Sequence, residues 1–206
     1  MISIIDYGNG NLAAFANIFS QLKVEFCITA DHNKLKCSDK YILPGVGAFD
    51  TTMKNLRKLG LDNLLTTEVI KNKKKILGIC IGMHILANSS EEGVEKGLSF
   101  IKGDIRKFSY QNLDKKGLYL PHMGWNSINV KHPINHLLKE VNQENGFYFL
   151  HNYYFCPDDK NDILATFNYG DEFPCVISNS NIYGIQFHPE KSQDNGLIVL
   201  RNFASL

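Results

Sequence analysis

Short apolar runs alternate with stretches of helical periodicity in the first half of the chain. The runs that predict strands are residues 2–5, 24–28, 41–43 and 76–79. Apolar residues recur at helical spacing over residues 12–22, 49–59 and 61–70, and Asn11 stands where the first of these helices needs an N-cap. Strands that alternate with helices predict βαβ units and a doubly wound, mostly parallel sheet.

The second half has a different pattern, in which strands follow one another without helices between them. The predicted strands are residues 119–120, 127–130, 147–150, 163–167, 175–177 and 182–187, and a helix over 197–203 closes the chain. Polar turn sequences at 168–171 and 178–181 indicate antiparallel strands added to the α/β core. Because no long linker or repeat interrupts the chain, residues 1–206 are predicted to form one domain.

The charge balance argues against two classes of partner. Lys and Arg number 22 against 21 Asp and Glu, a net charge of +1, whereas nucleic acids and anionic membranes are bound through a basic excess. No run approaches the ~18 apolar residues of a membrane span. The N-terminus lacks the basic start of a signal peptide, so a cytoplasmic protein is expected.

The five cysteines are odd in number and widely spaced, without a CxxC motif, so no disulfide framework is expected. Cys27, His32 and Cys37 are evenly spaced, but three ligands in this spacing match no zinc pattern, and no metal site is predicted. Since neither disulfides nor a metal site are expected, at least one cysteine is a candidate for a reactive thiol.

Glycines flank one thiol, Cys80, in the segment Gly-Ile-Cys-Ile-Gly. The segment lies between a predicted strand and a predicted helix, the layout of a nucleophile elbow with Cys in place of Ser. Gly78 and Gly82 leave room for the tight turn, and the helix N-terminus favours a thiolate. The N–H of Ile81 would point at a tetrahedral oxyanion. Taken alone, the motif also suits a small buried cysteine.

A nucleophilic cysteine needs a base, and His188 stands out among the seven histidines. It follows the apolar run 182–187, at the carboxyl end of a strand, where α/β active sites lie. Pro189 fixes the backbone after it, and the carboxylate of Glu190 is close enough to hold the imidazole in one tautomer. The predicted triad is therefore Cys80, His188 and Glu190.

A glycine-rich loop, Gly45-Val46-Gly47, follows the predicted strand at 41–43. Glycines here let the backbone approach a ligand and offer a second N–H donor to an oxyanion. The loop lacks the glycine patterns of Walker A and dinucleotide-binding motifs, so a phosphate loop is not predicted.

The motifs Pro-Gly-x-Gly, Gly-x-Cys-x-Gly and Phe-His-Pro-Glu, in this order, resemble the class I (triad) glutamine amidotransferases over nearly the whole chain. Within that family, several segments are similar to the glutaminase subunits of imidazole glycerol phosphate synthase, most specifically Pro-His-Met-Gly-Trp-Asn. These segments are residues 6–11, 44–49, 121–126, 147–151 and 186–192.

The resemblance implies a flavodoxin-like, three-layer α/β fold. It implies that Cys80 attacks the carboxamide of glutamine and that water then releases glutamate. Ammonia would pass to a separate (β/α)₈ cyclase subunit in a heterodimer, which makes imidazole glycerol phosphate and aminoimidazole carboxamide ribotide in histidine biosynthesis. No metal ion or organic cofactor is implied.

The same resemblance implies a partner interface that includes Asn11, Met123, Trp125, Tyr148 and Lys191. For Met123 and Trp125, packing in the core is the competing interpretation.

One position departs from the family pattern, because His84 stands where a glutamine that holds the substrate is usual. His84 lies one helical turn after Cys80 and is able to face the same pocket. It is either a substitute polar contact for the substrate or a tolerated residue without that role. As a base it would be poorly aimed at the sulfur.

The sequence leaves three other functions open. A paralogous glutaminase could supply ammonia to a sugar-modifying enzyme of surface-polysaccharide synthesis. An inactive scaffold could only activate a barrel partner, which the presence of all three triad residues disfavours. A thiol hydrolase could act on peptides or esters.

Overall fold

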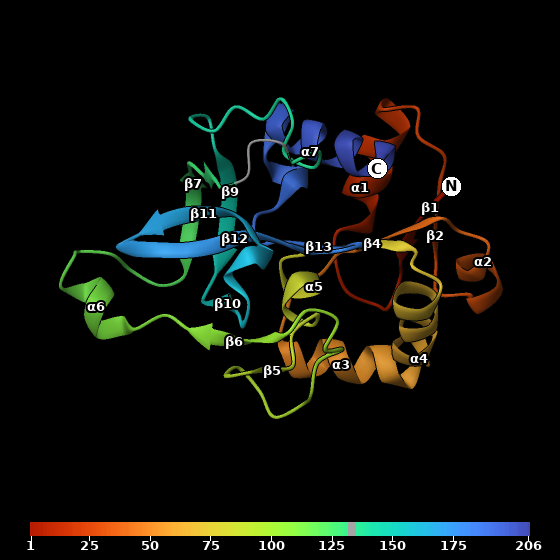
Figure 1. The fold of residues 1–206 in the computed structure, drawn as a ribbon, viewed down its shortest axis with the longest axis horizontal. Helices are drawn as coiled ribbons and strands as arrows, with labels where there is room; N and C mark the ends of the chain where they lie inside the picture. Colours follow the sequence, from red (N-terminus) through yellow and green to blue (C-terminus); the bar gives the residue numbers. More distant parts are fainter. Residues whose placement is uncertain (132–134) are drawn as a thin grey trace.

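The computed structural model describes residues 1–131 and 135–206, and its largest element is an eight-stranded sheet (Figure 1). The parallel strands are, in spatial order, β2 (Phe26–Thr29), β1 (Ile2–Ile5), β3 (Lys40–Leu43), β4 (Lys75–Ile79) and β13 (Ile182–Ile185). The antiparallel strands that continue the sheet are β12 (Asp171–Asn179), β11 (Ile163–Tyr169) and β8 (Asn129–Val130). The predicted mostly parallel sheet with added antiparallel strands is confirmed, and its order β2-β1-β3-β4 is flavodoxin-like.

Helices cover both faces of this sheet and give the molecule three layers (Figure 1). One face carries α1 (Leu12–Gln21) and α7 (Gln193–Ser205), which contact each other. The other carries α3 (Phe49–Lys58), α4 (Leu61–Leu65) and the π-helical turn η1 (Thr66–Lys71). In the described part of the chain, no helix has the length and apolar character needed to cross a membrane.

Side chains alternate between the two faces along each strand, which builds two separate apolar cores. Ile42 of β3 packs in the core that contains Phe15 and Phe19 of α1, whereas its neighbours Tyr41 and Leu43 pack in the core under α3 and α4. The N-cap predicted at Asn11 is present, since its side chain accepts the N–H of Ala14.

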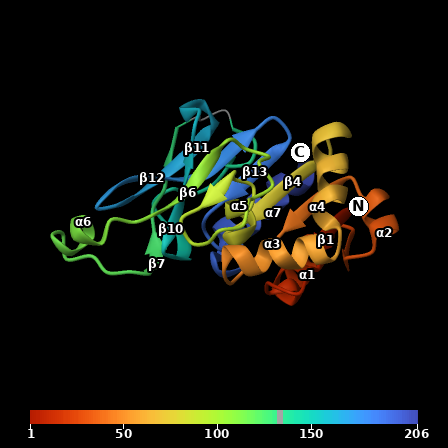
Figure 2. The ribbon, with the colours of Figure 1, turned by 90° about the horizontal axis from the view of Figure 1, so that it is seen from below.

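Two smaller sheets lie beside the antiparallel end of the main sheet (Figure 2). One joins β10 (Tyr153–Pro157), β6 (Gly103–Lys107) and β5 (Ser89–Ser90), and the other pairs β7 (His122–Asn126) with β9 (Phe147–His151). The strand predicted at residues 119–120 is wrong, because the strand begins only at His122, after Pro121, which has no N–H for a ladder. The short helices α2 (His32–Lys36) and α6 (Tyr110–Asp114) were not predicted.

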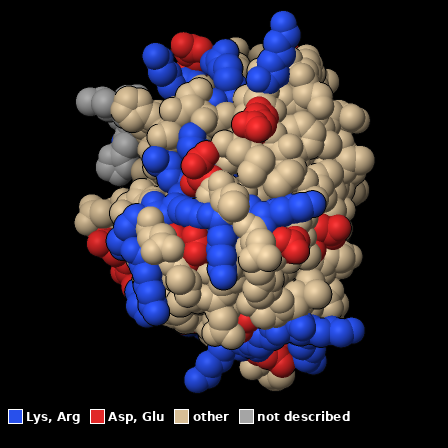
Figure 3. Space-filling model, turned by 90° about the vertical axis from the view of Figure 1, so that its right-hand side faces the viewer, with Lys and Arg blue, Asp and Glu red and all other residues tan. Residues whose placement is uncertain are grey.

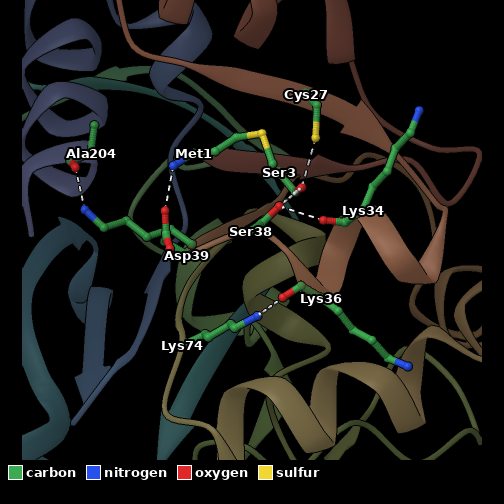
Figure 4. A network of polar contacts seen from close by, with 10 residues as sticks. Met1, Ser3, Cys27, Lys34, Lys36, Ser38, Asp39, Lys74 and Ala204 are labelled. Atoms are coloured by element: carbon green, nitrogen blue, oxygen red, sulfur yellow. Dashed lines mark hydrogen bonds and ion pairs between the residues drawn. The ribbon is translucent and has the colours of Figure 1, made fainter.

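A band of Lys and Arg side chains crosses the end of the molecule that carries β2 and α2, with acidic side chains among them (Figure 3). Lys74 in this region has a structural role, because its ammonium group pairs with Glu68 at 2.6 Å. It also donates to the carbonyl of Lys36 at 2.6 Å (Figure 4). Lys36 is the last residue of α2, where a cation is favourable. These contacts tie η1 and α2 to the sheet.

Candidate active site

Cys80 lies at the tip of a tight turn between β4 and the short helix α5 (Ile81–His84). Its backbone angles, φ 54° and ψ −113°, are strained for a residue with a β-carbon and are those expected of a nucleophile elbow. Close backbone contacts explain the flanking glycines. A Cβ on Gly78 would lie 2.4 Å from the carbonyl oxygen of Gly82, and a Cβ on Gly82 would lie 1.8 Å from that of Leu43.

His188 lies beside Cys80 because β4 and β13 are parallel neighbours and both residues follow the carboxyl ends of these strands. Nδ1 of His188 is 2.8 Å from Oε1 of Glu190, and both side chains are almost completely buried. Burial acts to lower the pKa of His188, but hydrogen bonds and charge interactions with Cys80 and Glu190 outweigh it and raise the pKa to about 10. The site therefore favours a protonated His188 imidazolium, held between Cys80 and Glu190.

The predicted oxyanion loop runs directly against the elbow. A Cβ on Gly45 would lie only 2.0 Å from Cγ2 of Ile81, so glycine is what lets the loop approach α5. Beneath the loop, the buried hydroxyl of Tyr7 donates a hydrogen bond to the carbonyl of Pro44. The base of the loop is thereby held in place.

The tip of the loop is free of such contacts. Val46 is 50% exposed. Gly47 has φ +112°, and a Cβ there would meet no atom within 4 Å. The N–H of Ile81, as the first residue of α5, has no partner within its own helix and is available to a ligand.

A cavity of about 180 Å³ opens at Cys80. Six predicted residues line it, namely Val46, Gly47, Cys80, Ile81, His84 and His188, whereas Gly45 and Glu190 do not. Glu92 also lines it and was missed by the sequence analysis, because a carboxylate in a loop carries no pattern of its own. Glu92 accepts the N–H of Phe49 at 3.0 Å, and its pKa is raised, mainly by burial.

His84 lines the cavity and also contacts Gln186, a residue to which the sequence analysis gave no role. Nε2 of His84 is 2.7 Å from Oε1 of Gln186, and Nε2 of Gln186 is 3.9 Å from Sγ of Cys80. Burial lowers the pKa of His84 to about 4, against the opposing effect of the bond to Gln186, so the imidazole is neutral near pH 7. The other nitrogen, Nδ1, has no hydrogen-bond partner among the described residues.

His151, which lines the cavity, forms a second buried pair with His122, with Nε2 of His151 2.9 Å from Nδ1 of His122. Because Nδ1 of His151 donates to the carbonyl of Tyr153 at 2.7 Å, its Nε2 must accept and His122 must donate from Nδ1. Burial lowers the pKa of both imidazoles, that of His122 to about 4. His122 stacks on Phe167 at 5.0 Å, so this pair belongs to the core.

The opposite face of the β7–β9 sheet is exposed and apolar. Strand pairing puts Trp125 opposite Tyr148 and Met123 opposite Leu150. Met123 is 64% and Trp125 is 49% exposed, so the core-packing interpretation of these two residues is wrong. Leu150 also lines the cavity, and Lys191 lies over the ring of Tyr148 at 5.3 Å. An apolar surface therefore reaches the mouth of the site.

The chain matches the family described as Glutamine amidotransferase class-I over residues 3–205, and it belongs to that family of enzymes. Among curated relatives, the imidazole glycerol phosphate synthase subunit HisH of Leptospira borgpetersenii is 47% identical over 206 residues, which cover the whole of both chains. Subunit HisH 2 of Methanococcus maripaludis is 47% identical over 204 residues, 98% of each chain. The resemblance expected from the motifs is confirmed.

Solved structures share the fold at low sequence identity. A glutamine amidotransferase has a TM-score of 0.74 and 17% identity, with 100% of this chain and 99% of that chain covered. A putative GMP synthase protein from Thermoplasma acidophilum has a TM-score of 0.72 and 20% identity, with 99% and 92% covered. These structures confirm the predicted class I glutamine amidotransferase fold.

Proposed function

We propose that this chain is the glutaminase subunit of an imidazole glycerol phosphate synthase in histidine biosynthesis, acting as one domain over residues 1–206. Full-length relatives that carry this subunit name support the assignment. The observation that carries the chemistry is the juxtaposition of Cys80, His188 and Glu190 at a cavity of about 180 Å³. The five free thiols suit a cytoplasmic protein.

The reaction begins with attack of the Cys80 sulfur on the carboxamide carbon of glutamine. The negative charge moves to the carboxamide oxygen, which the N–H groups of Ile81 and Val46 stabilise. His188, held by Glu190, gives its proton to the departing nitrogen, and ammonia leaves with formation of a glutamyl thioester. His188 then takes a proton from water, which attacks the thioester and releases glutamate and the thiolate.

The cavity offers groups of the right charge for the two ends of the substrate. The carboxamide of glutamine must reach Cys80, and we place the α-ammonium group beside Glu92, the carboxylate among the described residues that line the cavity. The carboxylate of Glu92 is suited to that cation. His84 lines the same cavity, which supports its role as a polar substrate contact.

The partner is the (β/α)₈ cyclase subunit, and its docking surface is the exposed apolar face of β7 and β9 with Lys191 and Asn11. Met123, Trp125 and Leu150 are exposed large apolar side chains that lie together, and such patches mark interfaces. Because Leu150 lines both the patch and the cavity, a partner docked there would sit over the site where ammonia forms.

A coupled assay with the co-purified cyclase tests this function. Cys80→Ala should abolish glutamine-dependent synthesis, and free ammonium at alkaline pH should restore synthesis by the same complex. The native chain should also restore growth to a strain that lacks its histidine-pathway glutaminase. Failure of ammonium to rescue the mutant would contradict the division of labour. Failure of the native chain to complement would favour the sugar-modifying alternative.

A further inference from the structure

Gln186 contacts both the sulfur of Cys80 and the imidazole of His84, and neither Gln186 nor His84 belongs to the triad. The side chain of Gln186 is fully buried at the end of β13, two residues before His188. Its Oε1 lies 2.7 Å from Nε2 of His84, and its Nε2 lies 3.9 Å from Sγ of Cys80. The three side chains form a short relay that crosses from α5 to β13 and back to the elbow.

The chemistry of the groups fixes the direction of this relay. A carboxamide oxygen only accepts hydrogen bonds and its nitrogen only donates. Since Oε1 of Gln186 accepts from His84, the imidazole is the Nε2–H tautomer, and the amide N–H₂ group is turned toward the sulfur. The reversed amide would put an oxygen against the sulfur and would require the Nδ1–H tautomer of His84. That tautomer would leave an N–H group buried without a partner among the described residues, so His84 favours the amide nitrogen of Gln186 at the sulfur.

His84 is suited to this role because it does not change charge. It is buried and its pKa is lowered to about 4, so it is a neutral donor near pH 7. Among the described residues, the other ionisable groups that line the cavity or lie beside Cys80 are His188 and Glu190 after β13, Tyr7 after β1, Glu92 after β5, His151 on β9 and Tyr153 on β10.

One neighbour of the Cys80 sulfur, the carbonyl of Leu150, is a hydrogen-bond acceptor rather than a donor. The carbonyl of Leu150 lies 4.0 Å from Sγ of Cys80 and accepts a hydrogen bond from the neutral thiol. A thiolate has no proton to donate, so this carbonyl favours the thiol, whereas a donor at the sulfur favours the thiolate. The amide of Gln186 is thus a donor that acts together with His188 against the carbonyl of Leu150.

We propose that Gln186 is a catalytic residue that donates a hydrogen bond to the Cys80 thiolate, and that His84 is a positioning residue that fixes the orientation of the Gln186 amide. The inference rests on the proposed role of Cys80 as the nucleophile. It gives the unusual histidine a function toward the sulfur in addition to its contact with substrate.

The test is the rate at which iodoacetamide alkylates Cys80 in the full chain, followed by mass spectrometry of the Cys80 peptide from pH 5 to 10. In Gln186→Met the rate near neutral pH should fall roughly three- to tenfold, since one donor to an anion is lost. The native rate should return at alkaline pH, where every variant is a thiolate. If Gln186→Met were still alkylated more slowly than the native chain at alkaline pH, the substitution would have altered the access of iodoacetamide to Cys80, and the proposal would be overturned. An alkylation profile equal to that of the native chain at every pH would overturn it as well.

Two substitutions of His84, to Gln and to Asn, test whether this residue orients the Gln186 amide, and both leave Gln186 in place. Gln in place of His puts an N–H₂ group near the position of Nε2, whereas Asn puts it near that of Nδ1. His84→Gln should keep the native alkylation profile, and His84→Asn should reproduce that of Gln186→Met. Equal profiles for the pair would contradict the orienting role.

These outcomes are distinct from failure of the proposed function. If Cys80→Ala kept its glutaminase activity, the nucleophile assignment itself would be wrong, whatever the alkylation profiles. If Cys80→Ala lost that activity while Gln186→Met and His84→Asn alkylated as the native chain does, only the relay would be wrong.

Discussion

Gly82 packs against the carbonyl oxygen of Leu43 so closely that a Cβ at position 82 would lie 1.8 Å from that oxygen. This contact joins the end of β3, from which the oxyanion loop departs, to the helix that carries the first oxyanion donor, Ile81. The close approach of β3 and its loop to α5 therefore requires the absence of a side chain at residue 82.

Gly82→Ala should force β3 and α5 apart. We expect a loss of about 2–3 kcal/mol in the free energy of unfolding, as for an overpacked core, and at least a roughly 10²-fold loss of glutaminase activity from the displaced donors. Urea unfolding and a glutamate-release assay measure both. Gly117→Ala is the control, because a Cβ there meets no atom within 4 Å and adds only the backbone strain of φ +65°, about 1 kcal/mol, with no change in activity expected. Equal stability and activity in the two variants would contradict the role of the contact.

Glu190→Gln should lower glutaminase activity by roughly 10²–10⁴-fold with little change in fold. The carboxylate of Glu190 accepts from Nδ1 of His188 and stabilises the imidazolium, whereas an amide lacks the charge and is able to present N–H₂ to the ring. The loss should appear in kcat, and thermal unfolding should confirm the fold. A variant with near-native kcat would remove Glu190 from the triad.

The buried histidines predict a specific acid sensitivity. His84, His122 and His151 have pKa values well below the 6.5 of an exposed histidine, so only the unfolded chain takes up their protons as the pH falls from about 6.5 toward 4. Stability is lost as the pH falls through this window, by up to about 4 kcal/mol per pH unit for three protons.

Urea unfolding at pH 5.0, 6.0 and 7.0 measures this loss in a range where most carboxylates are still ionised. His84→Gln removes one of the three titrating groups and should flatten the decline by about a third. If the native chain were equally stable at pH 5 and pH 7, the neutral burial of these histidines would be wrong.

The exposed tip of the oxyanion loop predicts control by the partner. Gly47 is able to change its backbone conformation at small cost, and a peptide flip beside it would turn the N–H of Val46 toward the site. One oxyanion donor is worth roughly 10²–10³ in rate, so hydrolysis should be slow in the free chain and rise by at least that range when the cyclase and its ligand bind.

Gly47→Pro should blunt this activation, because proline removes an N–H and fixes φ near −65°, far from the +112° at this residue. Binding of the cyclase, followed by calorimetry, should weaken little. Equal glutaminase rates for the free and the assembled native chain would refute the gating, although not the chemistry of Cys80.

Much of the fold could be predicted because parallel strands and amphipathic helices carry strong periodic signals. The apolar run at 76–79 is the central strand β4, and the runs predicted in the first half correspond to the parallel strands β1 to β4. The strand β6 (Gly103–Lys107) was missed because it lies in a small sheet with one face toward solvent, where only Ile105 provides a buried apolar side chain at its centre.

The residues of the candidate site also fall into those that a local motif predicts and those that only tertiary contacts place. Cys80, His188 and the loop glycines have tight backbone requirements, so they leave short motifs in the sequence. Glu92 and Gln186 were missed because their positions depend on tertiary contacts, with Phe49 and with His84, that no local pattern records.

The most direct test of the central claim uses a diazoketone analogue of glutamine, which alkylates the nucleophile of a glutaminase. After incubation of the native chain with its cyclase, peptide mass mapping should find one label on Cys80 and none on Cys27, Cys37, Cys156 or Cys175, with glutaminase activity lost in proportion. Excess glutamine should protect Cys80. Inactivation with the label on another residue, or labelling of Cys80 with activity retained, would contradict the assignment of Cys80 as the residue that forms the glutamyl thioester.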